Sequence, residues 1–155
     1  GISLGMALAG KQLGQTWRVY TMIGDGESNE GSVWEAAMAG GHFKLDNWTV
    51  FADCNDFMID GRTEDIMGLE PLGEKWESFR WHVQEIDGHD FNQICTAIET
   101  AQGVQGKPAI IICRTKKGYG VDFMEDQRAW HYGGLDDDMA QKALASVRKR
   151  YENLI

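Results

Sequence analysis

The sequence of 155 residues has few cysteines and no long apolar run. The three cysteines, Cys54, Cys95 and Cys113, are odd in number and show no CxxC spacing, which argues against a disulfide framework and a zinc site. A reducing cytoplasm is therefore the expected location. No apolar run approaches the roughly 20 residues that a membrane-spanning helix requires. We expect no membrane segment.

Positive charge is also scarce. The formal net charge is −9, whereas a nucleic-acid-binding surface needs clustered Lys and Arg to neutralise phosphates. We therefore expect no nucleic-acid partner, and any phosphate must be bound by local groups. The length allows one domain over residues 1–155 that buries roughly two thirds of the surface exposed by the unfolded chain. Residues 1–11 have no initiator Met and are typical of a small-residue helix, so we expect an N-terminal part of this domain upstream.

Short segments rich in β-branched and aromatic residues alternate with helical patterns. Such segments occupy residues 19–23, 48–53, 82–86 and 109–113, and helices are expected at about 32–43, 90–102 and 136–150. This alternation predicts an α/β fold with a parallel sheet flanked by helices. On the helix at 90–102, the pattern predicts one core-facing stripe, formed by Phe91, Ile94, Cys95, Ile98 and Ala101.

A third glycine is missing from the turn after the first strand. The turn begins Gly24-Asp25-Gly26, but Asn29 stands where a dinucleotide-binding loop has its last glycine. A carboxylate facing a phosphate would cost roughly 4 kcal/mol at about 4 Å and an effective dielectric near 20. A divalent cation placed between the carboxylate and the phosphate makes the net electrostatic interaction energy favourable. We therefore hypothesise that Asp25 ligates a cation that grips a diphosphate, the alternative being an ordinary turn aspartate.

A second ligand should follow a neighbouring strand, because ligands of open α/β sheets lie beyond the carboxyl ends of the strands. Asn55 follows the strand at 48–53 and offers a neutral oxygen. Asp53, Asn55 and Glu64 also match three positions of an EF-hand loop. Phe57 and Met58, however, replace a ligand and the required glycine of that loop, and a strand precedes it. The EF-hand interpretation fails.

The spacing of these residues resembles that of a known cofactor family. Gly24-Asp25-Gly26 followed by 28 residues and Asn55, with IDGHD at 86–90, CRTKKGYG at 113–120 and FMEDQRAWH at 123–131, resembles thiamine diphosphate-dependent enzymes. The chain is similar to the N-terminal, diphosphate-binding domain of transketolase, or to the N-terminal subunit of a split transketolase. The resemblance implies that residues 1–155 are the C-terminal portion of a diphosphate- and metal-binding domain.

The resemblance also implies roles for particular residues. Asp25, Asn55 and the backbone carbonyl of Phe57 would ligate Mg²⁺, with Ca²⁺ or Mn²⁺ as alternatives. The cofactor-binding set would be Gly24, Asp25, Gly26, Glu30, Asn55, Phe57 and His131, with Gly26 donating its N–H to the diphosphate.

Three side chains would take part in catalysis by the same resemblance. Glu30 and Glu35 match glutamates of a carboxylate network between cofactor sites, although a solvated helix face would show the same pattern. His131 matches a histidine that lines the substrate channel. Tyr132 departs from the family, which often has glycine directly after this histidine. His89 would cap the next helix or brace the fold, and Lys116 and Lys117 would face water or lie near phosphate.

The activity implied by the resemblance is transfer of a two-carbon ketol unit from a ketose phosphate to an aldose phosphate. It would require a C-terminal subunit carrying the pyrimidine-binding domain, in a heterotetramer with two copies of each subunit. Two alternatives stay open: a decarboxylative condensation like that of 1-deoxyxylulose-5-phosphate synthase, and a non-catalytic cofactor-binding subunit.

Overall fold

The computed structural model describes residues 1–152 and, within them, contains one four-stranded parallel sheet. The strands are β1 (Val19–Gly24), β2 (Trp48–Cys54), β3 (His82–Asp87) and β4 (Ala109–Arg114), in the spatial order β1-β2-β4-β3. The predicted strands and the α/β class are confirmed, and each strand ends one residue later than expected. All four carboxyl ends therefore meet at one edge of the sheet.

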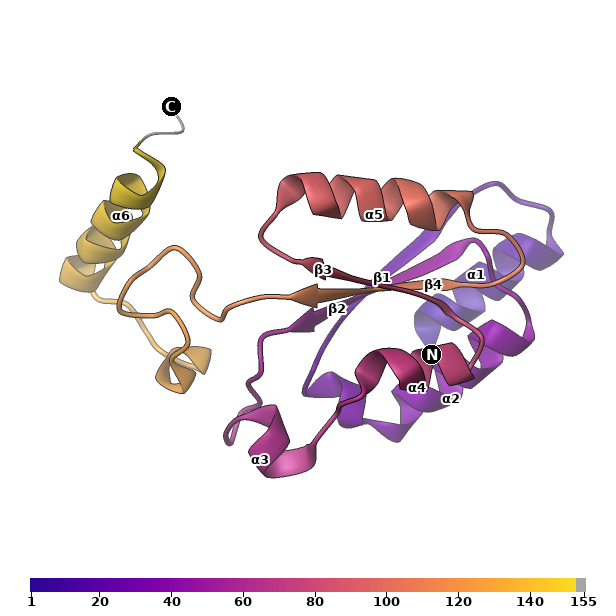
Figure 1. Cartoon of the computed structure of the whole chain (residues 1–155), viewed down its shortest axis with the longest axis horizontal. Helices are drawn as coiled ribbons and strands as arrows, with labels where there is room; N and C mark the ends of the chain where they lie inside the picture. The colour runs from indigo at the N-terminus through magenta and orange to yellow at the C-terminus, as the bar shows by residue number, and fades with distance from the viewer. Residues whose placement is uncertain (153–155) are drawn as a thin grey trace.

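Helices cover both faces of the sheet (Figure 1). Helix α5 (Phe91–Gly103) lies over one face, and α1 (Ile2–Gln12), α2 (Gly31–His42) and α4 (Leu72–Ser78) lie over the other. The remaining helical elements are short or peripheral: η1 (Glu27–Asn29), α3 (Thr63–Met67), η2 (Arg128–His131) and α6 (Asp137–Tyr151). None of the helices within residues 1–152 combines the length and the apolar character needed to span a membrane.

Successive residues of β4 feed two separate hydrophobic cores. Ile110 and Ile112 are buried against α2 and α4, together with Trp48, Trp76 and Trp81. Ile111 is buried on the opposite face beneath α5. This alternation follows from the period of two in a strand, with both faces of a parallel sheet covered.

Small residues on α2 allow the helix to approach the aromatic core closely. A Cβ at Gly40 would lie 2.8 Å from the Trp48 ring, which is closer than carbon atoms approach without a clash. The Trp81 indole donates a 2.8 Å hydrogen bond to the carbonyl of Ala37 on the same helix. Substitution of Gly40 by a larger residue would therefore displace α2 from the sheet.

The predicted core-facing stripe of α5 is partly wrong. Ala97 and Ala101 are the buried residues of this helix, whereas Cys95 is exposed and Phe91 is 81% exposed. Phe91 lies on the same stripe as Ile94 but in the first turn, where no described element covers it. Cys95 was expected in the stripe, but it points about 100° farther around the helix than Ile94 and is exposed. The helix meets the sheet through alanines because small side chains let it lie close to β3 and β4.

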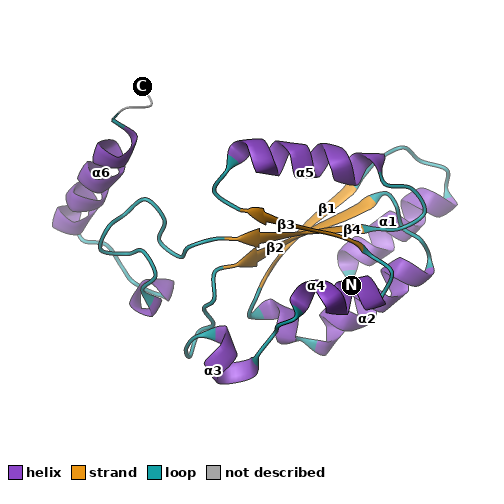
Figure 2. Cartoon of the chain, viewed as in Figure 1, coloured by secondary structure: helices purple, strands orange, loops and turns teal. Residues whose placement is uncertain are grey.

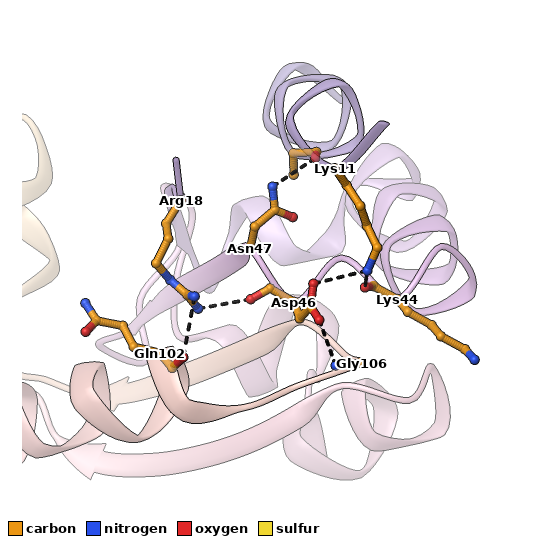
Figure 3. A network of polar contacts seen from close by, with 8 residues as sticks. Lys11, Arg18, Lys44, Asp46, Asn47, Gln102 and Gly106 are labelled. Atoms are coloured by element: carbon orange, nitrogen blue, oxygen red, sulfur yellow. Dashed lines mark hydrogen bonds and ion pairs between the residues drawn. The ribbon is translucent and has the colours of Figure 1, made fainter. Parts of the chain in front are cut away.

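A polar network ties the opposite edge of the sheet together (Figure 3). The Arg18 guanidinium donates to the carbonyls of Asp46 at 3.0 Å and Ala101 at 3.1 Å. The Asp46 carboxylate accepts from the Gly106 N–H at 2.9 Å and pairs with Lys11 Nζ at 3.1 Å. Burial raises the pKa of Asp46, but the contacts with Gly106 and Lys11 outweigh it and hold the pKa below its usual value. The network connects α1 and α5 to the loops that enter β2 and β4.

Replacing Asp46 with Asn should lower the free energy of unfolding at pH 7 by about 1 kcal/mol or less, because a partly exposed ion pair is screened by solvent. A lowered folded-state pKa stabilises the protein above the unfolded-state value of 3.8. That contribution is lost as the pH falls through the folded-state pKa. Urea titrations should therefore show a difference between wild type and Asp46→Asn that is constant above pH 5 and shrinks below about pH 4. A difference that persists at pH 2.5 would contradict this assignment.

Candidate functional site

The carboxyl ends of β1 and β2 meet at Asp25, which directly follows β1. The two strands pair in parallel with Gly24 opposite Asp53, so the residues after each strand are neighbours. Asp25 donates its backbone N–H to the Asp53 carbonyl at 3.1 Å. Its carboxylate accepts from the N–H of Gly26 at 2.8 Å and from the N–H of Asn55 at 3.1 Å. The side chain of Asp25 thus bridges the two strand ends.

The turn after Asp25 is closed by local hydrogen bonds. The Ser28 hydroxyl donates to the Gly24 carbonyl at 2.8 Å, and the Ser28 N–H donates to the Asp25 carbonyl at 3.1 Å. These bonds form η1, after which Glu30 takes an extended conformation and α2 begins at the next residue. Glu30 is therefore placed at the N-terminus of α2, near the strand ends.

Burial of Asp25 makes its charge unfavourable. The residue is only 4% exposed, and the ion pairs found among residues 1–152 do not include it. Desolvation is the main cause that raises the pKa of Asp25, the nearby Asp53 charge adds to it, and backbone N–H donors including Gly26 and Asn55 oppose it. A buried carboxylate without a cationic partner is the arrangement that a bound cation would relieve.

The loop after β2 presents several oxygen atoms near this carboxylate. The Asn55 side-chain oxygen accepts the Phe57 N–H at 3.2 Å, and Asp56 adopts a left-handed conformation with φ 65°. Phe57 then forms an isolated antiparallel bridge with Arg62. The turn keeps the polar backbone of residues 55–57 beside Asp25 while the Phe57 ring is buried.

A cavity of about 650 Å³ collects most of the predicted site residues. Its wall includes every residue of the predicted cofactor-binding set: Gly24, Asp25, Gly26, Glu30, Asn55, Phe57 and His131. Glu35 does not line the cavity, because it lies farther along α2 on an exposed position. Its role stays a prediction.

His131 reaches this cavity from a different part of the chain. It ends η2, after the long segment that follows β4, and its ring contacts Tyr132 edge to face at 4.7 Å between centroids. The His131 Nδ1 atom is buried and has no hydrogen-bond partner among the described residues. A buried imidazole nitrogen without a partner is costly unless a ligand or water satisfies it.

Lys117 is one of the residues that line the cavity. The sequence alone allows it either to face water or to lie near a phosphate. It lines the cavity together with Asp25 and His131, whereas most loop lysines simply face water. Its carbonyl accepts the Asp126 N–H at 3.0 Å. The next residue, Gly118, has φ 73°, and a Cβ there would lie 2.5 Å from the Met124 carbonyl oxygen. Lys117 is thus held by close packing within the segment that follows β4.

His89 braces the fold, as the sequence predicts. Its Nε2 accepts the Lys116 N–H at 2.8 Å, and its ring stacks on Tyr119 at 3.6 Å between centroids. The helix cap is supplied instead by Asp90, whose carboxylate accepts the N–H of Asn92 at 2.9 Å. His89 therefore holds the loop that carries Lys117.

The donor set suits a hard cation that takes its remaining ligands from elsewhere. No group of three or more His, Cys, Asp or Glu side chains capable of holding a metal occurs within residues 1–152. Asp25, the Asn55 side chain and the backbone carbonyl of Phe57 are oxygen donors of the kind preferred by Mg²⁺ or Ca²⁺. Three such donors leave coordination positions for phosphate oxygens or water. The residues therefore fit a cation that is bound together with an anionic ligand.

Comparison with known proteins gives consistent matches over nearly the whole chain. Residues 5–151 match the family model for the transketolase thiamine diphosphate binding domain. The 6-deoxy-6-sulfo-D-fructose transketolase subunit SqwG of Clostridium sp. (strain MSTE9) is 46% identical over 147 residues, covering 95% of this chain and 54% of that protein. An apulose-4-phosphate transketolase subunit of Phocaeicola vulgatus is 37% identical over 153 residues, covering 99% and 54%.

The fold has the same relatives. A crystal structure of transketolase from Campylobacter jejuni superposes with a TM-score of 0.85 at 25% identity, over 97% of this chain and 24% of that one. The chain thus spans about half the length of the curated subunits that it matches.

The raised pKa of Asp25 predicts an unusual pH dependence for the cofactor-free protein. Because the folded state binds this proton more tightly than the unfolded state, wild type should gain stability as the pH falls from the folded-state pKa towards 3.8. Asp25→Asn has no such proton. Urea titrations at several pH values should therefore show wild type gaining relative to Asp25→Asn on acidification. A relative loss would contradict the burial argument.

Proposed function

Because the chain belongs to the transketolase family and matches its thiamine diphosphate binding domain, we propose that it supplies the diphosphate- and metal-binding half of a transketolase-type active site. The reaction is transfer of a two-carbon ketol unit from a ketose phosphate to an aldose phosphate. The observation that supports this proposal most directly is the buried, unpaired Asp25 carboxylate, bridged to Asn55 in a cavity shared with His131.

Different residues would bind the metal ion and the diphosphate. Asp25, Asn55 and the Phe57 carbonyl would hold Mg²⁺, and the Gly26 N–H would donate to the diphosphate. Lys117 lies on the same cavity wall and would balance the remaining phosphate charge. Thiamine diphosphate, when bound, supplies the carbon nucleophile and electron sink for cleavage of the carbon–carbon bond.

His131 would act on the sugar. His131 lines the cavity, and an imidazole at this position is suited to exchange a hydrogen bond or a proton with a substrate hydroxyl. Glu30 would contribute to a carboxylate network at the N-terminus of α2, and we keep Glu35 as the second carboxylate of that network. Both glutamates are exposed in this chain, as expected for residues that act across an interface.

A partner subunit is part of the proposal. We propose a C-terminal subunit that carries the pyrimidine-binding domain, in a cytoplasmic heterotetramer with two copies of each. Two relatives named as transketolase subunits support a divided enzyme. The sugars in their names are 6-deoxy-6-sulfo-D-fructose and apulose 4-phosphate. The shared chemistry is a ketose with an anionic end, which is the substrate class that we propose for this chain.

Two other functions of the same site are separable by experiment. A decarboxylative condensation would use pyruvate as donor and release carbon dioxide. A non-catalytic subunit would bind the cofactor and transfer nothing. A donor panel of ketose phosphates, sulfonated ketoses and pyruvate, offered to the reconstituted complex, distinguishes all three.

Asp25→Ala should weaken Mg²⁺-dependent binding of thiamine diphosphate by roughly a hundredfold or more, since loss of even an outer-shell partner of a metal site costs roughly tenfold to a hundredfold. Calorimetric titration of the chain, alone and with its partner, measures this effect. Asp65→Ala is the matched control, because Asp65 is an exposed residue of α3. Unchanged affinity in Asp25→Ala would overturn the proposed metal site.

His131→Ala should reduce kcat of ketol transfer in the reconstituted complex by roughly a hundredfold, the lower range for a general acid or base. Thiamine diphosphate affinity should change by less than about threefold. His42→Ala, at an exposed position at the end of α2, should keep wild-type kcat. Equal rates for wild type and His131→Ala would remove His131 from the chemistry.

A further inference from the structure

The two segments that carry the proposed ligands and the proposed catalytic histidine are tied directly to each other. We call residues 55–62 the metal loop and residues 124–131 the histidine segment. Arg128 of the histidine segment donates from Nη1 to the Asp60 carbonyl at 2.7 Å, with a longer contact to the Ile59 carbonyl at 3.4 Å. Arg62 of the metal loop pairs in return with Asp126 at 2.9 Å. Each segment therefore contributes one arginine that grips the other.

Arg62 is also anchored to the residue whose carbonyl is a proposed ligand. Its guanidinium lies over the Phe57 ring, 4.7 Å from the centroid, and the backbones of the two residues form an antiparallel bridge. The turn between them is closed by the Met58 N–H, which donates to the Gly61 carbonyl at 2.8 Å. A displacement of Asp126 would therefore be transmitted to Phe57 through the Arg62 side chain.

Both segments contain a residue in a conformation that L-amino acids adopt rarely. Asp56 has φ 65° and Asp126 has φ 56°. Such conformations persist where surrounding contacts hold them, and they gather at functional sites. The Asp56 carbonyl accepts the Thr63 N–H at 3.0 Å, and the Asp126 N–H donates to the Lys117 carbonyl at 3.0 Å. Asp126 is thus itself part of the contact between the segments, and Asp56 directly precedes Phe57, on whose ring Arg62 lies.

These contacts are poorly placed to serve stability alone. The side chains of Arg62 and Asp126 are 47% and 57% exposed, and exposed ion pairs contribute little to folding. Their geometric effect is larger, because they join a strand-end loop to a segment more than 60 residues away in sequence. Loss of the two arginine side chains would remove both guanidinium contacts between the metal loop and the histidine segment, which contains η2.

We propose that Arg62 and Arg128 are positioning residues that fix His131 against the metal loop, so that occupation of the loop by a divalent cation and diphosphate sets the orientation of the imidazole. This inference rests on the proposed function of Asp25, Asn55 and His131. Loosening the arginine contacts should uncouple the orientation of His131 from cofactor binding. Because coupling between two sites is reciprocal, cofactor binding should lose no more than this coupling free energy.

The test follows the His131 ring by ¹H–¹³C NMR of the full chain labelled in histidine, titrated with Mg²⁺ and thiamine diphosphate. The signal is assigned with His131→Asn. In wild type, the His131 Cε1 resonance should shift on cofactor binding. In Arg128→Met and Arg62→Met, we expect less than half of that shift, with cofactor affinity within about threefold of wild type. Arg128→Lys should recover part of it, because an ammonium can still donate to the Asp60 carbonyl.

Matched variants separate positioning from folding. Arg148→Met, an equal change of charge at an exposed position of α6, should show the full wild-type shift. The unfolding midpoints of the loop variants should lie within about 4 °C of wild type, as expected for exposed pairs. If Arg62→Met unfolds, Asp126→Asn removes the same ion pair with an isosteric side chain and should give the same reduced shift.

The outcomes distinguish this inference from the proposed function. A full wild-type shift in Arg128→Met and Arg62→Met overturns the positioning role. If wild type binds no cofactor, either alone or with its proposed partner subunit, the proposed function fails, and the cofactor-free spectra decide the inference alone. The two variants should then move or broaden the His131 resonance relative to wild type and Arg148→Met, and unchanged resonances would overturn it.

Discussion

The hydrogen bond from the Asn55 N–H to the Asp25 carboxylate is the contact on which the site depends. It joins the ends of β1 and β2, and it exists because the two strands are parallel and in register, with Gly24 opposite Asp53. In an antiparallel pair, the residues after each strand would lie at opposite edges of the sheet. The parallel arrangement in turn requires the helices between strands, which cover both faces in Figure 2.

The same contact explains why a buried carboxylate is tolerated. Asp25 is nearly inaccessible, and its raised pKa shows that burial outweighs the hydrogen bonds it accepts. A residue whose charged form is held at a cost in the cofactor-free chain is typical of a site shaped by function and not by stability. The buried Nδ1 atom of His131, a residue of the same cavity wall, has no hydrogen-bond partner among the described residues.

Much of the fold could be predicted from local sequence because each strand is a short β-branched or aromatic run between turn residues. The position of Asp25 beside Asn55 was also predictable, since both follow neighbouring strands whose carboxyl ends share an edge. The contacts of α5 were predicted less well. Hydrophobic periodicity identifies a stripe on a helix, but the extent of the sheet beneath decides which turns are covered. Phe91 and Cys95 were therefore expected in the core and are exposed.

The sequence by itself determined the class of fold, the turn at Asp25 and the position of Asn55 after the next strand. These features depend on local backbone preferences and on the order of strands. Only the tertiary structure decided that Lys117 lines the cavity, that Glu35 does not, and that Arg128 reaches the loop of Asn55. Those contacts join segments far apart in the chain, and their geometry depends on how the loops beyond β2 and β4 pack together. No local pattern of residues encodes that packing.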